Sequence, residues 1–70
     1  MAEVRAEMVG NVWRVVAHQG DTVADGDTIV IIESMKMEIP VLAESAGTVT
    51  NLPVEEGQVV QEGDLIAVID

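Results

Sequence analysis

The stretch that decides the fold is Ile29–Leu42, which reads IVIIESMKMEIPVL. Two aliphatic runs lie on either side of a short polar centre, and this pattern predicts a β-hairpin with Met35 and Lys36 at its tip. Tight hairpin turns favour Asn-Gly, Asp-Gly or Gly-Gly, because their central residues need positive φ. No Gly, Asn or Asp occurs between Asp27 and Gly47. A turn built against local preference indicates a position that function has determined.

Lys36 is the only lysine of the chain, so apart from the N-terminus it is the sole amine that can be acylated. Most lysines at loop tips are simply solvated, but this one lies between Met35 and Met37, whose adaptable apolar side chains suit recognition by a partner. A Schiff-base or general-base role needs burial or nearby cations, whereas Glu33 and Glu38 favour the charged amine. We therefore interpret Lys36 as a residue that an enzyme modifies, with the two carboxylates as weaker candidates for recognition.

The hexapeptide Glu33–Glu38, ESMKME, resembles the biotinylation motif of biotin carboxyl carrier domains, Glu-Ala-Met-Lys-Met. The resemblance to this biotinyl/lipoyl attachment family covers the whole chain, and it is closest to the small stand-alone biotinylated proteins of mycobacteria and related bacteria. It implies that a biotin protein ligase joins biotin to Lys36 through an amide. It also implies that Met35 and Met37 guide recognition by the ligase and by later partners. Ser34 replaces the commoner Ala, a small-for-small change.

The function that the resemblance implies is that of a carrier and not of an enzyme. Tethered biotin would move a carboxyl group between the active sites of a biotin carboxylase and a carboxyltransferase, which partner subunits must supply. A lipoyl carrier of 2-oxoacid dehydrogenases is one alternative, although lipoyl motifs usually carry Asp-Lys-Ala, so Met-Lys-Met favours biotin. A binding module or biotin sink in which Lys36 is never modified is the other. A carrier would engage both the ligase and a carboxylase, and an inert module neither.

Length and composition restrict the other classes of function. Seventy residues predict one domain spanning 1–70. The chain has no cysteine and one histidine, so neither a disulfide nor a Cys- or His-rich metal site is expected. A formal charge of −10 argues against nucleic acid and anionic membranes as partners. No apolar run approaches the roughly 20 residues of a membrane span, and residues 1–5 lack signal-peptide character. We expect a cytoplasmic monomer.

An internal repeat organises the chain beyond the hairpin. Residues 10–33 align with residues 47–70 at a constant offset of 37, with eight identities over 24 positions. The identical pairs are Gly10/Gly47, Val12/Val49, Gly20/Gly57, Val23/Val60, Gly26/Gly63, Asp27/Asp64, Ile29/Ile66 and Ile32/Ile69. Two copies are too few for a solenoid. We expect them to close one core by pseudo-twofold symmetry.

Eight short strands separated by Gly-containing turns predict an all-β fold, a flattened barrel or sandwich of two four-stranded antiparallel sheets. The expected strands are Glu3–Met8, Asn11–Ala17, Thr22–Val23, Thr28–Glu33, Met37–Leu42, Thr48–Val54, Gln58–Val60 and Leu65–Ile69. Biotinyl and lipoyl domains have this architecture, with the modified lysine at a hairpin tip. The symmetry places both termini at the opposite end, and the Met start and final strand fit a free-standing carrier, although a domain cut from a larger carboxylase would look similar.

Five other features have structural interpretations. We expect Trp13 to pack on a half-buried face, which is favoured over binding a partner, and His18 to be exposed in a turn. Arg5 and Arg14 are expected to pair with surface carboxylates, which contributes little. Glu55-Glu56 is expected to be a solvated face, because no nucleophile or cleft accompanies it. The absence of Phe and Tyr predicts a thin core of small branched side chains.

The segment before Gly10 departs from the family pattern. Carrier domains often have Ala-Pro-Met-Pro-Gly here, of which Met8 and Gly10 remain together with Ala6, whereas Glu7 and Val9 occupy the proline positions. In the family this segment packs near the modified hairpin, so the departure bears on that local contact and leaves the biotinylation motif unchanged.

Overall fold

The computed structural model describes residues 1–70 and consists of strands and turns without a helix. Its strands are β1 (Ala2–Arg5), β2 (Gly10–Val15), β3 (Thr22–Val23), β4 (Thr28–Ser34), β5 (Met37–Leu42), β6 (Gly47–Asn51), β7 (Val59–Val60) and β8 (Leu65–Ile69). They form two four-stranded sheets, the first in the order β1-β8-β6-β3 and the second in the order β5-β4-β2-β7. All neighbours are antiparallel. The predicted all-β sandwich of two four-stranded sheets is confirmed.

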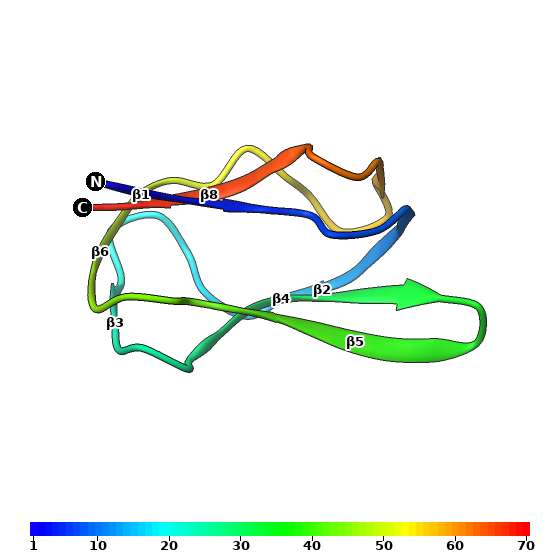
Figure 1. Cartoon of the computed structure of the whole chain (residues 1–70), viewed down its shortest axis with the longest axis horizontal. Coiled ribbons are helices and arrows are strands. Elements are labelled where there is room, and N and C mark those ends of the chain that lie inside the picture. The colour runs from blue at the N-terminus through cyan, green and yellow to red at the C-terminus, as the bar shows by residue number, and fades with distance from the viewer.

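The two sheets pack face to face as thin layers, with β1 and β8 above β4 and β5 in Figure 1. All fifteen buried residues are Val, Ile or Ala, and no polar side chain is buried. The largest fully buried side chains are the two repeat-related pairs Ile29/Ile66 and Ile32/Ile69. The molecule measures 31 × 17 × 17 Å, so a core without Phe or Tyr fills the space between the layers, as predicted.

Pseudo-twofold symmetry relates the two sheets strand by strand. Adding 37 to the residue numbers turns β2, β3 and β4 into β6, β7 and β8, and subtracting 37 from β5 gives β1. The order of the first sheet thereby becomes the order of the second. Even the irregularities repeat, because the register of β2 shifts between Val12 and Arg14 and that of β6 between Val49 and Asn51. The predicted symmetry is confirmed.

The repeated Gly-Asp dipeptides close equivalent turns. The carboxylate Oδ2 of Asp27 accepts a hydrogen bond from the backbone N–H of Ala24 at 2.8 Å, and Asp64 does the same for Gln61 at 2.8 Å. The preceding glycines have φ of 93° and 90°. This left-handed region is open to Gly at no steric cost. The turns are therefore encoded locally.

The first strand is shorter than expected, because it ends at Arg5 and not at Met8. Its register with β8 shifts between Val4 and Arg5. The backbone of Ala6 then bonds to the turn before β8: its N–H donates to the Asp64 carbonyl at 2.9 Å, and its carbonyl accepts from Gly63 at 2.8 Å. The chain leaves the ladder there and crosses towards the second sheet.

Two other strands also end early. β2 ends at Val15 and not at Ala17, since the N–H groups of Val16 and Ala17 both donate to the Ile29 carbonyl and break the regular ladder. The strand expected to reach Val54 ends as β6 at Asn51. Pro53 follows shortly after, and proline has no N–H to continue a ladder.

The bulge in β2 changes which side chains face inward. Val12 pairs with Ile32 while Arg14 pairs with Ile31, so Trp13 is the extra residue. Trp13 keeps 45% of its surface exposed, so slightly more than half of it is covered, which agrees with the half-buried position that we predicted. A two-residue alternation cannot anticipate a bulge, which shifts the parity of every later residue in the strand.

The charged surface agrees only in part with expectation. Arg5 donates to Glu3 Oε1 at 2.9 Å, and His18 is exposed, as predicted. Arg14 has no carboxylate within ion-pair distance, so its predicted pairing is wrong. Its cross-strand neighbour is Ile31, which offers no charge. No helix in the structure has the length and apolar character needed to cross a membrane.

Candidate functional site

The site is built on the β4–β5 hairpin, the most extensively paired part of the molecule. Its ladder runs from Thr28 opposite Leu42 to Ser34 opposite Met37, which leaves Met35 and Lys36 as a two-residue turn. β4 is also paired with β2 on its other side, and its inward-facing side chains include the fully buried Ile32. The turn is thus held by an inner strand of the second sheet, and the predicted hairpin tip is confirmed.

Both turn residues adopt a conformation that favours glycine. Met35 has φ of 52° and Lys36 has φ of 67°, and they are the only non-glycine residues of the chain with positive φ. Two left-handed residues in succession define a type I′ turn, whose twist matches that of the flanking strands. Each left-handed residue with a Cβ atom costs about 1 kcal/mol. The ladder supplies the stability that holds this turn in place.

Lys36 projects from one pole of the molecule. We call this end, defined by Met35 and Lys36, the hairpin pole, and the end that holds Met1 and Asp70 the terminal pole. Figure 1 shows the β4–β5 turn at the right end and both termini at the left end. Lys36 is exposed and takes part in none of the ion pairs. Its amine is therefore free to enter the active site of another protein, and the predicted opposite placement of the termini is confirmed.

Methionines surround the lysine with apolar surface. Met35 is 92% exposed and Met37 is 63% exposed. Exposed apolar side chains of this size gain free energy when a partner covers them. Met35 and Met37 are the sequence neighbours of Lys36. A protein that covers both methionines therefore also lies close to the lysine.

Glu33 and Glu38 face each other directly across the hairpin, next to the Ser34–Met37 pair that closes the turn. Both are exposed and neither has an ion-pair partner. Like charges at directly opposite positions destabilise a ladder. The sequence indicates both residues as acidic neighbours of Lys36, but only the register shows that they repel each other.

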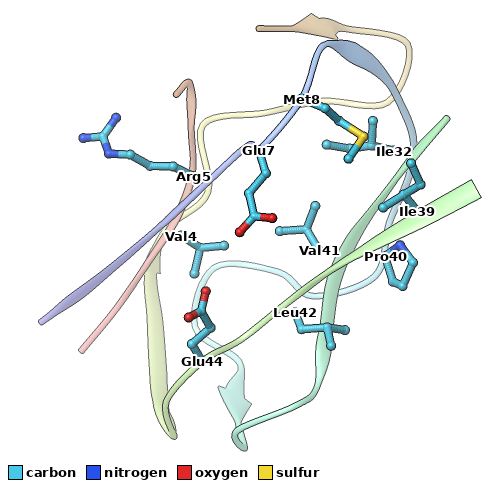
Figure 2. Close-up of a pocket in the computed structure, with 10 residues that line it drawn as sticks. All are labelled: Val4, Arg5, Glu7, Met8, Ile32, Ile39, Pro40, Val41, Leu42 and Glu44. Atoms are coloured by element: carbon cyan, nitrogen blue, oxygen red, sulfur yellow. The ribbon is translucent and has the colours of Figure 1, made fainter. Parts of the chain in front are cut away.

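A groove of about 300 Å³ opens between the β1 end of the first sheet and the β5 edge of the second. Figure 2 shows it lined by side chains from β1 and the segment after it, from β4, and from β5 and the segment after it. We call this the axial groove, because Val4 and Val41 are related by the offset of 37, as are Glu7 and Glu44. The groove therefore straddles the pseudo-twofold axis.

Met8 lies in the axial groove beside Ile32 and Ile39 of the hairpin, as Figure 2 shows. The contact between this segment and the hairpin that the family pattern implied is thus present, although the prolines are absent. The groove itself was missed at the sequence level. The internal repeat contains a signal for the groove. It makes Val4 and Val41 equivalent residues on β1 and β5, the edge strands of the two sheets.

The chemistry available at the hairpin pole is that of one exposed amine. No group of three or more His, Cys, Asp or Glu side chains in the molecule could hold a metal ion. The neighbours of Lys36 are two thioethers and two carboxylates, and no nucleophile–base pair accompanies them. The arrangement can present an amine for acylation, and an acyl group attached there would meet solvent on most sides. A covalently tethered cofactor fits the site on this ground.

Comparison with known proteins places this geometry among attachment domains. A family model described as "Biotin-requiring enzyme", of the biotin/lipoyl type, matches residues 2–69. A biotinylated protein TB7.3 homologue of Mycolicibacterium smegmatis is 66% identical over 44 residues, which cover 61% of this chain and 62% of that protein. A biotin/lipoyl attachment protein of Bacillus subtilis is 48% identical over 40 residues, covering 57% of this chain and 55% of that protein. These alignments span less than two thirds of the relatives' own length.

Solved structures show the same architecture inside larger chains. The Kluyveromyces lactis urea carboxylase contains a segment that matches 99% of this chain with a TM-score of 0.93 and 40% sequence identity. A single-chain, multi-domain long-chain acyl-CoA carboxylase matches 94% of this chain with a TM-score of 0.88 and 33% identity. In each case the match covers 6% of the larger chain. Both neighbours are carboxylases in which this fold is one small part.

Proposed function

Because the chain belongs to the biotin/lipoyl family of biotin-requiring proteins, we propose that it is a biotin carrier whose Lys36 receives biotin from a biotin protein ligase. The observation that carries this proposal is the lysine itself, which is exposed and unpaired at the tip of a firmly held type I′ turn. Amide formation needs an activated carboxyl group, and the hairpin pole has no residues that could activate one. The ligase must supply it.

Once attached, biotin supplies the chemistry of a carboxyl carrier, which takes a carboxyl group from a biotin carboxylase and gives it up at a carboxyltransferase. The chain's own contribution is mechanical: the β4–β5 ladder fixes where the arm begins, and its start at the hairpin pole lets the arm extend away from the domain into a partner's active site. Tethering replaces an encounter between free molecules with a high effective concentration. The likeness to urea and acyl-CoA carboxylases supports partners of this class.

Met35 and Met37 are the residues that we propose the ligase and the later partners recognise. Their exposure at 92% and 63% leaves most of their apolar surface for a partner to cover. Glu33 and Glu38 add negative charge beside Lys36, which favours partners with basic clefts. The chain itself we propose to be a carrier and not an enzyme, because the site offers an attachment point without acid–base or nucleophilic partners.

Residues 1–70 are proposed to act as one biotinyl domain. Both sheets contribute to a single core cluster, so neither half is expected to be stable without the other. A net charge of −10 makes copies of the chain repel one another, which favours a monomer. The cytoplasm is the proposed location, because ATP, bicarbonate and acyl-CoA esters meet there.

The test is the intact mass of the protein produced in cells with biotin and an active ligase, beside the Lys36→Ala variant. The expected result is a mass higher by one biotinyl group, absent from the variant. An unmodified protein would sink the biotin assignment, and a lipoyl increment would move the function to 2-oxoacid dehydrogenases. Transfer of labelled bicarbonate to the protein by a biotin carboxylase with ATP then separates a carrier from a module that only binds biotin.

A further inference from the structure

The axial groove is asymmetric in a way that the pseudo-twofold does not explain. Val4/Val41 and Glu7/Glu44 are symmetry mates, so this part of the groove follows from the fold. On the side of the hairpin pole the groove continues along Met8, Ile32, Ile39 and Pro40. The corresponding positions on the side of the terminal pole are Ser45, Ile69, Ala2 and Glu3, none of which lines it. An apolar extension therefore exists only on the side of Lys36.

We propose that this extension is a resting site for the biotinyl group of the chain's own Lys36. The inference rests on the proposed function and assigns the ring system to the surface formed by Met8, Ile39 and Pro40, above the buried Ile32. In Figure 2 these side chains lie together at one end of the groove, and the Glu7 carboxylate points into its middle. A fused ring with a thioether and an apolar edge suits the Met8 end. The two ureido N–H groups at its far edge suit a carboxylate acceptor, Glu7.

The length of the arm agrees with this placement. Ile39 lies three residues from Lys36 along an extended strand, which corresponds to about 10 Å. The lysine side chain and the pentanoyl chain of biotin together contribute about ten bonds, which span about 11 Å when extended. The ring can thus reach Met8 and Ile39 with the arm lying along β5. Its ureido edge then approaches Glu7, whereas Glu44, at the end of the groove away from the hairpin, lies beyond its reach.

The groove is open to solvent, which fits a site that the arm must leave. A carrier needs its cofactor available to two partners in turn, so the resting site has to be weak and shallow. Resting there would shield the apolar part of the ring from water between encounters. Of the two residues that do this, Met8 is retained from the family's usual Ala-Pro-Met-Pro-Gly segment, whereas Glu7 replaces one of its prolines.

The test uses protein biotinylated chemically with an activated biotin ester, so it does not depend on any ligase. The ester labels both Lys36 and the α-amino group. The Lys36→Arg variant carries the label only on the α-amino group, and it therefore shows which spectral changes come from that second label. Methyl NMR spectra with and without biotin are compared. We expect shifts of the Met8, Ile32 and Ile39 methyl groups and nuclear Overhauser effects between the ring and the Met8 methyl group, all absent from the control.

Matched variants then test the role of the carboxylate. Glu7→Ala is expected to lower the ratio of docked to free arm about tenfold, because hydrogen bonds to charged groups are the stronger class. Its symmetry mate Glu44→Ala should change little, and Met8→Ala should reduce the docked fraction as well. Shifts confined to residues 35–37, or equal losses in Glu7→Ala and Glu44→Ala, would overturn the proposal. The mass of each labelled protein shows that biotin is attached. A negative docking result would therefore count against the resting site and not against the proposed carrier function.

Discussion

At the hairpin pole β4 turns into β5 through Met35 and Lys36, whereas at the terminal pole their counterparts β8 and β1 lie side by side as the two ends of the chain. The strands at the two poles pair alike. Glu33 pairs with Glu38 at the hairpin pole, and the equivalent residues at the terminal pole are Asp70 and Met1. Here the charges differ: the Met1 ammonium lies 3.6 Å from the Asp70 carboxylate, whereas the hairpin pole sets two carboxylates against each other.

The two poles differ in whether the fold alone accounts for the residues found there. The terminal pole satisfies local physics, with opposite charges paired and no residue forced into positive φ. The hairpin pole has like charges opposed and two left-handed residues that are not glycine. Departures from local preference that concentrate at one of two equivalent sites mark that site as functional.

The largest change in stability is expected from substitutions at two equivalent glycines. A Cβ atom on Gly10 would lie 2.5 Å from Ile32 Cγ2 and 2.8 Å from the Glu33 carbonyl oxygen. On Gly47 it would lie 2.8 Å from the Asp70 carbonyl oxygen and 2.9 Å from Ile69 Cγ2. We expect each Gly→Ala variant to be destabilised by about 1–3 kcal/mol.

Gly10→Ala should be the worse of the two, because its Cβ atom would come within 2.5 Å of Ile32 Cγ2, closer than any contact that a Cβ atom on Gly47 would make. Urea unfolding followed by Trp13 fluorescence measures the difference, and each kcal/mol should lower Tm by about 4–8 °C. A Gly47→Ala variant as unstable as Gly10→Ala would contradict this difference between the poles, since the terminal pole would then be as rigid as the hairpin pole.

A smaller effect is expected at the turn. Met35→Gly removes the cost of a left-handed residue with a Cβ atom and should stabilise the protein by about 0.5 kcal/mol after the greater freedom of the unfolded chain is subtracted. The same variant should be biotinylated more slowly, because a partner loses apolar surface. Met35→Leu is the control, with unchanged stability and faster modification than Met35→Gly. If Met35→Gly proved less stable than the unmodified sequence, the turn would not be strained.

The smallest effect concerns the charge pairs. Glu38→Gln removes the repulsion with Glu33 and should stabilise the protein by about 0.2–1 kcal/mol at low salt. Asp70→Asn removes an exposed pair with the Met1 ammonium and should cost at most a few tenths of a kcal/mol. Added salt should shrink both changes, since it screens exposed charges. The same sign for both variants in urea unfolding would contradict the assignment of opposite electrostatics to the two poles.

Much of this could be predicted from the sequence, because the decisive signals are local or repeated. The aliphatic runs beside Met35 and Lys36 fixed the hairpin, and the offset of 37 fixed the symmetry and the positions of the termini. β3, β5 and β8 have the predicted bounds. The site followed from an uncommon turn and a single lysine, without any knowledge of the packing.

The remainder depends on interactions between distant residues. The early ends of β1 and β2 come from backbone bonds to Asp64, Gly63 and Ile29. The bulge at Trp13 belongs to the register between β2 and β4. No local pattern encodes either feature. Arg14 lacks an acidic neighbour because the bulge sets it opposite Ile31. The axial groove required both edges of the sandwich to be placed before its lining could be identified.

The most direct measurement of the central claim compares the two amines at opposite poles, the α-amino group and Lys36. Purified protein is incubated with a biotin protein ligase, ATP and biotin, and its tryptic peptides are mapped by mass spectrometry. Trypsin can cleave only after Arg5, Arg14 and Lys36, and an amide on Lys36 blocks the last cleavage. We predict one biotin per chain, carried on an undivided peptide 15–70, and no label on the α-amino group. Biotin on the α-amino group, or none on Lys36 when a chemical ester labels that residue readily, would contradict the account.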